Sequence, residues 1–257
     1  MTAIFDTHAH YDDKAFDEDR EGLLISLPAQ GIGRVVNVGS SLDSCKKTLE
    51  LMDSYDYIYG AIGIHPSDTA ELTEGDMDWL KTCCSHRKCV AVGEIGLDYY
   101  WDEPERELQK KWFVRQLELA RQVKKPVIIH SREAARDTAD ILTAERAGEI
   151  GGVIHCYSYT KETAKVYLDM GFFFGIGGVL TFKNAKKLKE AVEYIPMDRI
   201  VLETDSPYLA PVPNRGKRNT SLNLPYVVSA MAQIKGLDEE ETRKITWDNA
   251  LRLYRIG

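Results

Sequence analysis

The stretch AIFDTHAHYDD, residues 3–13, joins a short apolar run to two histidines and a group of acids. His8 and His10 stand two positions apart at the end of that run. In a strand such residues point to the same side and lie roughly 6–7 Å apart, so two imidazoles can converge there. A doubly wound sheet would instead carry a glycine-rich dinucleotide-binding turn after its first strand. The stretch therefore indicates a strand that ends in metal ligands.

Seven more runs of this kind follow along the chain, separated by longer amphipathic stretches. Near-continuous apolar runs are typical of strands buried on both faces, as in a parallel sheet. Periodicity and end signals predict helices at residues 107–123, 160–171 and 237–254. Strands that alternate with helices predict an α/β fold of the TIM (β/α)8 barrel type. The predicted strands are AIFDTH (3–8), RVVNVGS (34–40), IYGAIGIH (58–65), CVAVGEIG (89–96), PVIIHS (126–131), GVIHCYS (152–158), FFFGIGG (172–178) and RIVLETD (199–205).

The composition predicts one domain. The chain has 257 residues, of which 44% are hydrophobic and 28% are charged, and single α/β barrels commonly have about this length. No linker rich in proline, glycine or serine divides it. We expect a single metal-dependent hydrolase barrel over residues 1–257, as a monomer or a weak oligomer.

Charge and cysteine content restrict the partners and the compartment. The net charge of −7 gives no general attraction for nucleic acids or anionic membranes, so a polyanionic substrate needs a local basic patch or metal ions. No stretch approaches the ~18 apolar residues of a membrane span, and we see no signal-peptide pattern. The five cysteines form no CxxC pair. Reduced thiols in the cytoplasm are thus a better interpretation than a structural zinc site.

Polar side chains gather at the ends of the predicted strands. Five of the six histidines stand there, with two carboxylates, and these ends meet at one mouth of a barrel. Such a set suits Zn²⁺, Mn²⁺, Fe²⁺ or Ni²⁺ better than Mg²⁺, which prefers oxygen ligands. The number of ligands exceeds the needs of one catalytic zinc, so we expect two divalent ions, with Zn²⁺, Mn²⁺ or Mg²⁺ as the candidates. The strand-end residues are His8, His10, His65, Glu94, His130, His155 and Asp205.

The segments that contain these residues resemble the TatD family of metal-dependent deoxyribonucleases, a branch of the amidohydrolase-like barrels. The resemblance covers essentially the whole chain. This chain departs from the family pattern in the loop after the last strand. Many relatives have Asn-Glu-Pro where this chain has Asn219, Thr220 and Ser221. The role of this loop is therefore left open. The matching segments are FDTHAHYD, GIHPSD, VGEIGLDYY, HSREA, HCYS, LETDSPYLAP, RGKRN and WDNALRLY.

The resemblance implies how the ligands are divided. One ion is held by His8, His10 and Asp205. The other ion is held by His130 and His155. Glu94 bridges the two, in the place where the broader superfamily often has a carbamylated lysine. The catalytic residues implied are Glu94 and Asp205.

The implied reaction is hydrolysis of a phosphodiester in DNA, of the 3′–5′ exonuclease type, by a water that the ions activate. Asp205 is the candidate for proton transfer from that water, and its alternative role is that of a ligand alone. Glu203, two residues earlier, is predicted to hold a ligand histidine through a hydrogen bond. An equally open alternative is that Glu203 is a charged residue inside the strand that pairs with an opposite charge.

Substrate contacts are predicted beside the mouth. Arg132 can bind a phosphate with its planar guanidinium, and Tyr99, Tyr100 and Trp101 can stack on a base or pack under the next helix. A basic loop follows the last strand, for which a solvated loop is the alternative. The predicted substrate-binding residues are His65, Arg132, Arg215, Lys217, Arg218 and Asn219.

Two other functions compete with the nuclease. An amidohydrolase or deacylase would use the same ions on a small molecule or on an acylated nucleotide or tRNA. A metal-binding scaffold without turnover is the third interpretation, and the full ligand set argues against it. The basic loop and Arg132 favour the nuclease.

Overall fold

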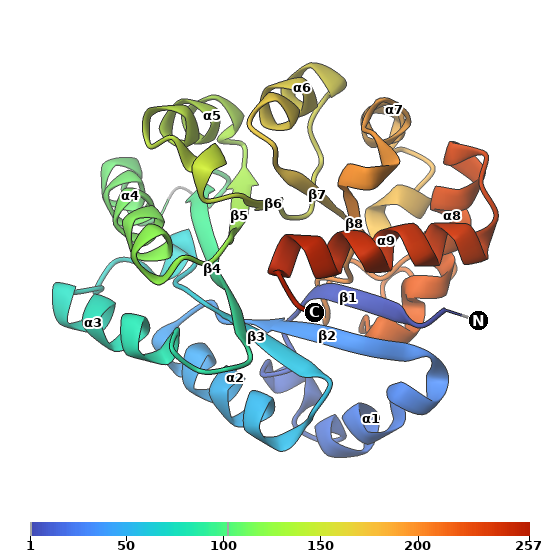
Figure 1. Ribbon diagram of the computed structural model, residues 1–257, viewed down its shortest axis with the longest axis horizontal. Helices are drawn as coiled ribbons and strands as arrows, with labels where there is room; N and C mark the ends of the chain where they lie inside the picture. The colour runs from blue at the N-terminus through green and yellow to red at the C-terminus, as the bar shows by residue number, and fades with distance from the viewer. Residues whose placement is uncertain (1, 102) are drawn as a thin grey trace.

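Eight parallel strands follow one another in sequence order around a nearly closed barrel in the computed structural model, which describes residues 2–101 and 103–257 (Figure 1). An isolated parallel bridge links Ala9 of the first strand to Ser206, in the segment that follows the last strand. The prediction of a TIM barrel is confirmed. The strands are β1 (Ile4–Ala9), β2 (Ile32–Val38), β3 (Ile58–Ile62), β4 (Cys89–Asp98), β5 (Val127–Arg132), β6 (Gly152–Ile154), β7 (Phe173–Ile176) and β8 (Ile200–Leu202).

Helices surround the strands (Figure 1). The three helices predicted from the sequence form, and their ends follow the capping residues. The Thr160 side chain accepts from the backbone N–H of Thr163 at the start of α6, and Asp238 accepts from that of Glu241 at the start of α9. The helices are α1 (Arg20–Ser26), α2 (Leu42–Ser54), α3 (Glu74–Cys83), α4 (Arg106–Val123), α5 (Ala135–Ala144), α6 (Lys161–Asp169), α7 (Lys186–Tyr194), α8 (Leu224–Lys235) and α9 (Glu239–Tyr254).

The core has two parts. Apolar side chains between the strands and the surrounding helices form the larger one. The smaller one contains buried side chains from all eight strands together with Ala250, Leu253 and Tyr254 of α9. The Tyr254 hydroxyl donates to the carbonyl oxygen of Thr7 at 2.8 Å. Because α9 packs against residues near the strand starts, such as Phe5, it closes that end and leaves the carboxyl ends of the strands as the mouth.

Several strands end elsewhere than predicted. β3, β6 and β8 stop before His65, His155 and Asp205, which lie in the loops that follow. His65 leaves the sheet because its Nδ1 accepts from the backbone N–H of Ser67 and caps a short 3-10 helix. β4 instead continues to Asp98, so Glu94 lies inside this strand rather than at its end.

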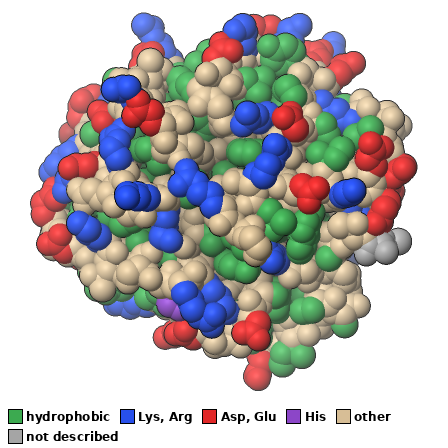
Figure 2. Space-filling model, in the orientation of Figure 1, with side chains coloured by type: hydrophobic (Ala, Val, Ile, Leu, Met, Phe, Trp, Pro, Cys, Tyr) green, Lys and Arg blue, Asp and Glu red, His purple; other side chains and the backbone are tan. Residues whose placement is uncertain are grey.

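The surface carries both signs of charge. Figure 2 shows basic and acidic side chains spread over the face that is seen in Figure 1. None of the helices in the described ranges is long and apolar enough to span a membrane.

Candidate metal centre

The mouth of the barrel brings the six predicted metal ligands together. His8 lies in β1 and His10 directly after it, and their Nε2 atoms are 3.1 Å apart. Glu94 Oε2 lies 3.4 Å from the Nε2 of His8 and 3.7 Å from that of His10. Asp205 Oδ1 lies 3.9 Å from the first of these nitrogens and 3.5 Å from the second. These four side chains form one group around a common centre.

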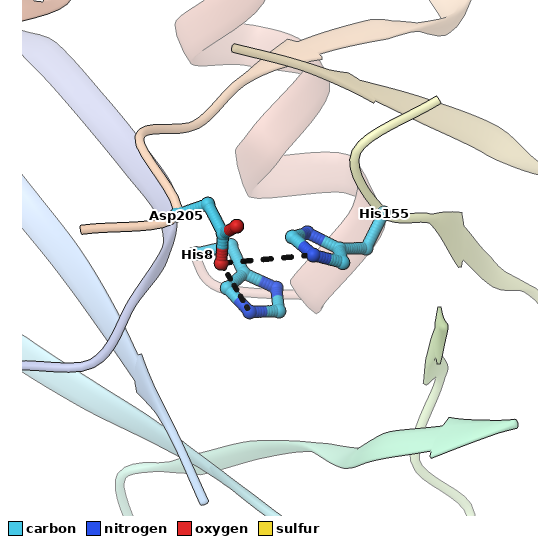
Figure 3. Close-up of side chains that lie close together, drawn as sticks. All are labelled: His8, His155 and Asp205. Carbon is cyan, nitrogen blue, oxygen red and sulfur yellow. Dashed lines mark ion pairs between the residues drawn. The ribbon is translucent and has the colours of Figure 1, made fainter. Parts of the chain in front are cut away.

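A second group of nitrogens faces the other oxygen of Glu94. The Nδ1 of His130 lies 2.6 Å from Glu94 Oε1, and the Nε2 of His155 lies 3.6 Å from it. Figure 3 shows Asp205 paired with both His8 and His155, whose rings stack with centroids 3.6 Å apart. The two oxygens of Glu94 therefore face two different nitrogen groups, which is the arrangement of a bridging ligand.

The electrostatics of this cluster favour cations. Burial opposes the charge of Glu94, but the charges of His155 and His130 lower its pKa well below the ordinary value. The pKa of Asp205 is likewise lowered by the surrounding histidines against the effect of burial. Burial also opposes protonation of His10, yet the carboxylates raise its pKa to about 9. Ionised carboxylates and imidazoles with ligand atoms within 4.8 Å of one another are a donor set that fits divalent ions such as Zn²⁺ or Mn²⁺.

Glu203 lies next to the His155 ring, on the side that faces away from the centre. Its Oε1 lies 3.0 Å from the Nδ1 of His155, and the same oxygen accepts from the backbone N–H of Cys156 at 2.6 Å. The carboxylate fits because position 175 is glycine, where a Cβ atom would come within 2.0 Å of Glu203 Oε2. Since Nδ1 faces Glu203, the Nε2 of His155 faces the centre, and the role of Glu203 in holding this ring stays a prediction.

Asp98 is a residue of this centre that the sequence analysis did not single out. Its Oδ2 lies 3.0 Å from the Nε2 of His130, so Nδ1 of that ring faces Glu94. Burial opposes the charge of Asp98, but its hydrogen bond with His130 lowers its pKa. A spacing of four residues in one strand places Glu94 and Asp98 on the same side, which is the signal that could have identified it.

Comparisons with known proteins agree with this geometry. The sequence model of the TatD related DNase family matches residues 5–255. The chain belongs to the TatD family. It is 44% identical to the uncharacterized metal-dependent hydrolase YabD of Bacillus subtilis, over 99% of this chain and 100% of that protein. It is 36% identical to the uncharacterized metal-dependent hydrolase YcfH of Escherichia coli K12, over 98% of this chain and 96% of that protein.

A solved TatD structure shares the fold closely. The crystal structure of YjjV, a TatD homologue from Escherichia coli K12, superposes with a TM-score of 0.92 at 28% identity and covers 99% of this chain and 98% of its own. The predicted TatD family is therefore confirmed, and the predicted activity holds at the level of a metal-dependent hydrolase of this family.

The Glu203 contact leads to a prediction that separates it from a general structural role. Glu203→Gln removes the charge behind His155 but keeps the size of the side chain. We expect the affinity for divalent ions to fall about 10- to 100-fold, because such supporting carboxylates orient a ligand ring and raise its basicity. Isothermal titration of the chelator-treated protein with Mn²⁺ measures this. Unchanged affinity would show that the centre does not use Glu203.

A cavity of about 740 Å³ opens at the candidate metal centre. His65 and Arg132 line it, as predicted for substrate contacts. Burial and neighbouring His130 lower the pKa of His65 to about 3, so the ring is neutral. Because its Nδ1 accepts from Ser67, the proton of the neutral ring is on Nε2. The Arg132 guanidinium lies 3.9 Å from the ring centroid of Tyr100 at the rim.

The predicted basic loop does not line this cavity. Arg218 instead donates two hydrogen bonds to the carboxylate of Asp19, at 2.7 and 2.6 Å, so a contact with phosphate would have to compete with this pair, and its role in substrate binding stays a prediction. Arg215 lies 4.4 Å from the ring centroid of Phe182, and Lys217 is exposed. A role for these two in substrate binding outside the cavity stays a prediction.

Asn219 was also predicted as a substrate contact, and the structure corrects this. Its side chain is fully buried, and its amide nitrogen donates to the carbonyl oxygen of Thr204 at 2.9 Å. Its amide oxygen accepts from the backbone N–H of Thr220 and from Asn223. Asn219 therefore supports the loop that carries Asp205 instead of touching substrate.

Proposed function

We propose that this TatD protein is a deoxyribonuclease that uses two divalent ions to release nucleotides from the 3′ end of DNA. The observation that carries the proposal is the placement of Glu94, whose two oxygens face two different nitrogen groups beneath an open cavity. The two nitrogen groups and Glu94 would hold the ions, which would supply charge stabilisation to the attacking and leaving oxygens of a phosphodiester. The family name supports DNA as the substrate.

The chain's own residues supply proton transfer and orientation. Asp205 is ionised in its surroundings, and its carboxylate faces the centre, so it is placed to accept a proton from the attacking water. Glu94 lies between the two nitrogen groups and directs one oxygen toward each of them. The ions, when bound, polarise the phosphate and make that water more acidic. The Nε2 hydrogen of His65 is available to a phosphate or leaving-group oxygen.

Cationic and aromatic side chains at the rim support binding of a nucleotide. Arg132 lines the cavity, and Trp101 lines it too, with 65% of its surface exposed. The Arg132 guanidinium also lies 6.0 Å from the Trp101 ring centroid. A guanidinium can bind a phosphate while an exposed indole stacks on a base.

One observation favours an amidohydrolase or deacylase as the second candidate. Among the described residues that line the cavity, Arg132 is the one lysine or arginine, while Asp12, Asp13 and Asp68 also lie there. A small or acylated substrate needs fewer cations than a polynucleotide does. The same centre would then cleave an amide or an acyl ester.

Nucleotide release decides between the two candidates. End-labelled DNA is incubated with the protein and Mn²⁺, and amides and acyl esters are offered in parallel. We expect mononucleotides from the 3′ end, loss of release with a chelator, and recovery when Mn²⁺ or Zn²⁺ is restored. An Asp205→Asn protein, purified identically, controls for contaminating nucleases. Turnover of amides or acyl esters without nucleotide release would establish the second candidate instead.

Substitution of Arg132 tests substrate binding separately from metal binding. Arg132→Ala should raise KM for an oligonucleotide about tenfold, because a hydrogen-bonded charge pair contributes about 1.5–3 kcal/mol. It should also reduce the slope of log affinity against log salt by about one. Arg136→Ala removes an exposed arginine of α5 and is the matched control. Equal changes in both variants would count against a phosphate contact.

The setting of the enzyme is part of the proposal. We propose one barrel domain that works in the cytoplasm, and the five free thiols support a reducing compartment. We propose Zn²⁺ or Mn²⁺ as the ions, because nitrogen ligands outnumber carboxylates in the centre.

A further inference from the structure

Asp6 is a fully buried carboxylate beneath the metal centre, and hydroxyl and amide groups surround it. Its Oδ2 accepts from the hydroxyls of Thr204 at 2.7 Å and Ser221 at 2.6 Å. Its Oδ1 accepts from the backbone N–H of Thr204 at 3.0 Å and of His8 at 3.3 Å. One carboxylate of β1 thus links the strand that carries His8 to the loop that follows β8.

A chain of hydrogen bonds leads from Ser221 back to the first βα loop. Because the Ser221 hydroxyl donates to Asp6, it accepts the hydroxyl of Tyr11 at 2.7 Å. The backbone N–H of Ser221 in turn donates to the Tyr11 oxygen at 2.9 Å. Tyr11, Ser221 and Asp6 are each fully buried, so none of these groups can exchange its partner for bulk water.

The same network fixes the residues on both sides of Asp205. Thr204 donates twice to Asp6, and its hydroxyl also contacts that of Ser206 at 2.6 Å. Asp205 itself has φ +57°, in the left-handed region that residues other than glycine adopt uncommonly. Its backbone N–H donates to the carbonyl oxygen of His8 at 2.9 Å. The direction of the Asp205 carboxylate therefore depends on how firmly its neighbours are held.

We propose that Ser221 is a positioning residue that, through Asp6 and Thr204, aims the Asp205 carboxylate at the metal centre. This gives a role to the loop that contains Thr220 and Ser221. The inference rests on the proposed metal-dependent function. Ser221 is not among the residues that line the cavity, so its effect has to pass through Asp205.

Ser221→Ala tests the inference by metal binding. The chelator-treated protein is titrated with Mn²⁺ alone by calorimetry and by electron paramagnetic resonance. We expect the affinity of one of the two ions to fall about tenfold, as when a supporting hydrogen bond to a ligand is lost. The other affinity should stay within about twofold. With a small phosphodiester, kcat should fall and KM should stay nearly unchanged.

Two further variants separate positioning from loss of stability. Thr246→Val removes a buried hydroxyl of α9, far from the mouth, and should change neither Mn²⁺ affinity. Tyr11→Phe removes the next hydroxyl of the chain, and adding it to Ser221→Ala should cause no further loss, because coupled sites are not additive. If Ser221→Ala loses stability as Thr246→Val does but keeps both affinities, the inference is wrong.

The outcomes also separate this inference from the proposed function. Two Mn²⁺ ions bound equally well by the wild type and by Ser221→Ala would overturn the role of Ser221 and leave the proposed function intact. A wild-type protein that binds no Mn²⁺ and no Zn²⁺ would overturn both. Loss of one affinity in Ser221→Ala, with the other retained, is the result that supports the inference.

Discussion

Glu94→Ala is expected to lose both ions and nearly all hydrolysis while the barrel remains folded. Each nitrogen group keeps its histidines but loses the carboxylate between them, so their affinity for divalent cations falls. The ions supply several kcal/mol of transition-state stabilisation, which corresponds to a rate lower by about 10³-fold or more. Metal content by mass spectrometry and the rate of nucleotide release measure the two effects together.

The fold should survive this change because the apolar core, which carries most of the stability of the barrel, is untouched. The interior apolar layer and α9 close the opposite end of the barrel and are left unchanged by this substitution. Circular dichroism of Glu94→Ala in a chelator, compared with wild type in the same chelator, is the control. A variant that still binds two ions with near-normal affinity would show that Glu94 does not bridge.

Asp205→Asn is expected to lower kcat by about 10²- to 10⁴-fold with little change in KM, because the amide keeps the shape but cannot accept the proton. Asp205 Oδ1 lies within 3.5–3.9 Å of three ligand nitrogens, so metal content has to be measured in the same preparation. A wild-type pH–rate profile complements the variant.

Asp205→Asn has three distinguishable outcomes. If Asp205→Asn keeps both ions and loses kcat, Asp205 is the base. If it keeps both ions and a near-normal kcat, Asp205 does not take the proton. Loss of an ion would establish Asp205 as a ligand, and the acid limb of the pH–rate profile then tests the base.

The barrel and the convergence of the candidate ligands at its mouth could be predicted from the sequence because both follow from local patterns. Buried strands read as apolar runs, and the spacing of two residues brings His8 of β1 and His10 just after it together, with their Nε2 atoms 3.1 Å apart. The residues at which the strands end were harder to predict from the sequence. His65 and Asp205 belong to loops whose paths are set by hydrogen bonds, which a run of apolar residues does not encode.

Contacts between distant loops could not be predicted. Arg218 and Asn219 read as a basic, polar loop beside the mouth, and that composition suits phosphate binding. The partner of Arg218 is Asp19, 199 residues earlier in the chain, and only the closed barrel brings the two together. Asp6 likewise read as an ordinary strand residue, although burial raises its pKa to about 7 against the hydrogen bonds that it accepts.

The position of the bound ions tests the central claim most directly. Crystals of the protein loaded with Mn²⁺ or Zn²⁺ give an anomalous difference map that locates each ion without reference to activity. We predict two peaks about 3.5–4 Å apart on either side of Glu94, one beside His10 and the other beside His130. A single peak, or peaks that Glu94 does not contact, would contradict the account.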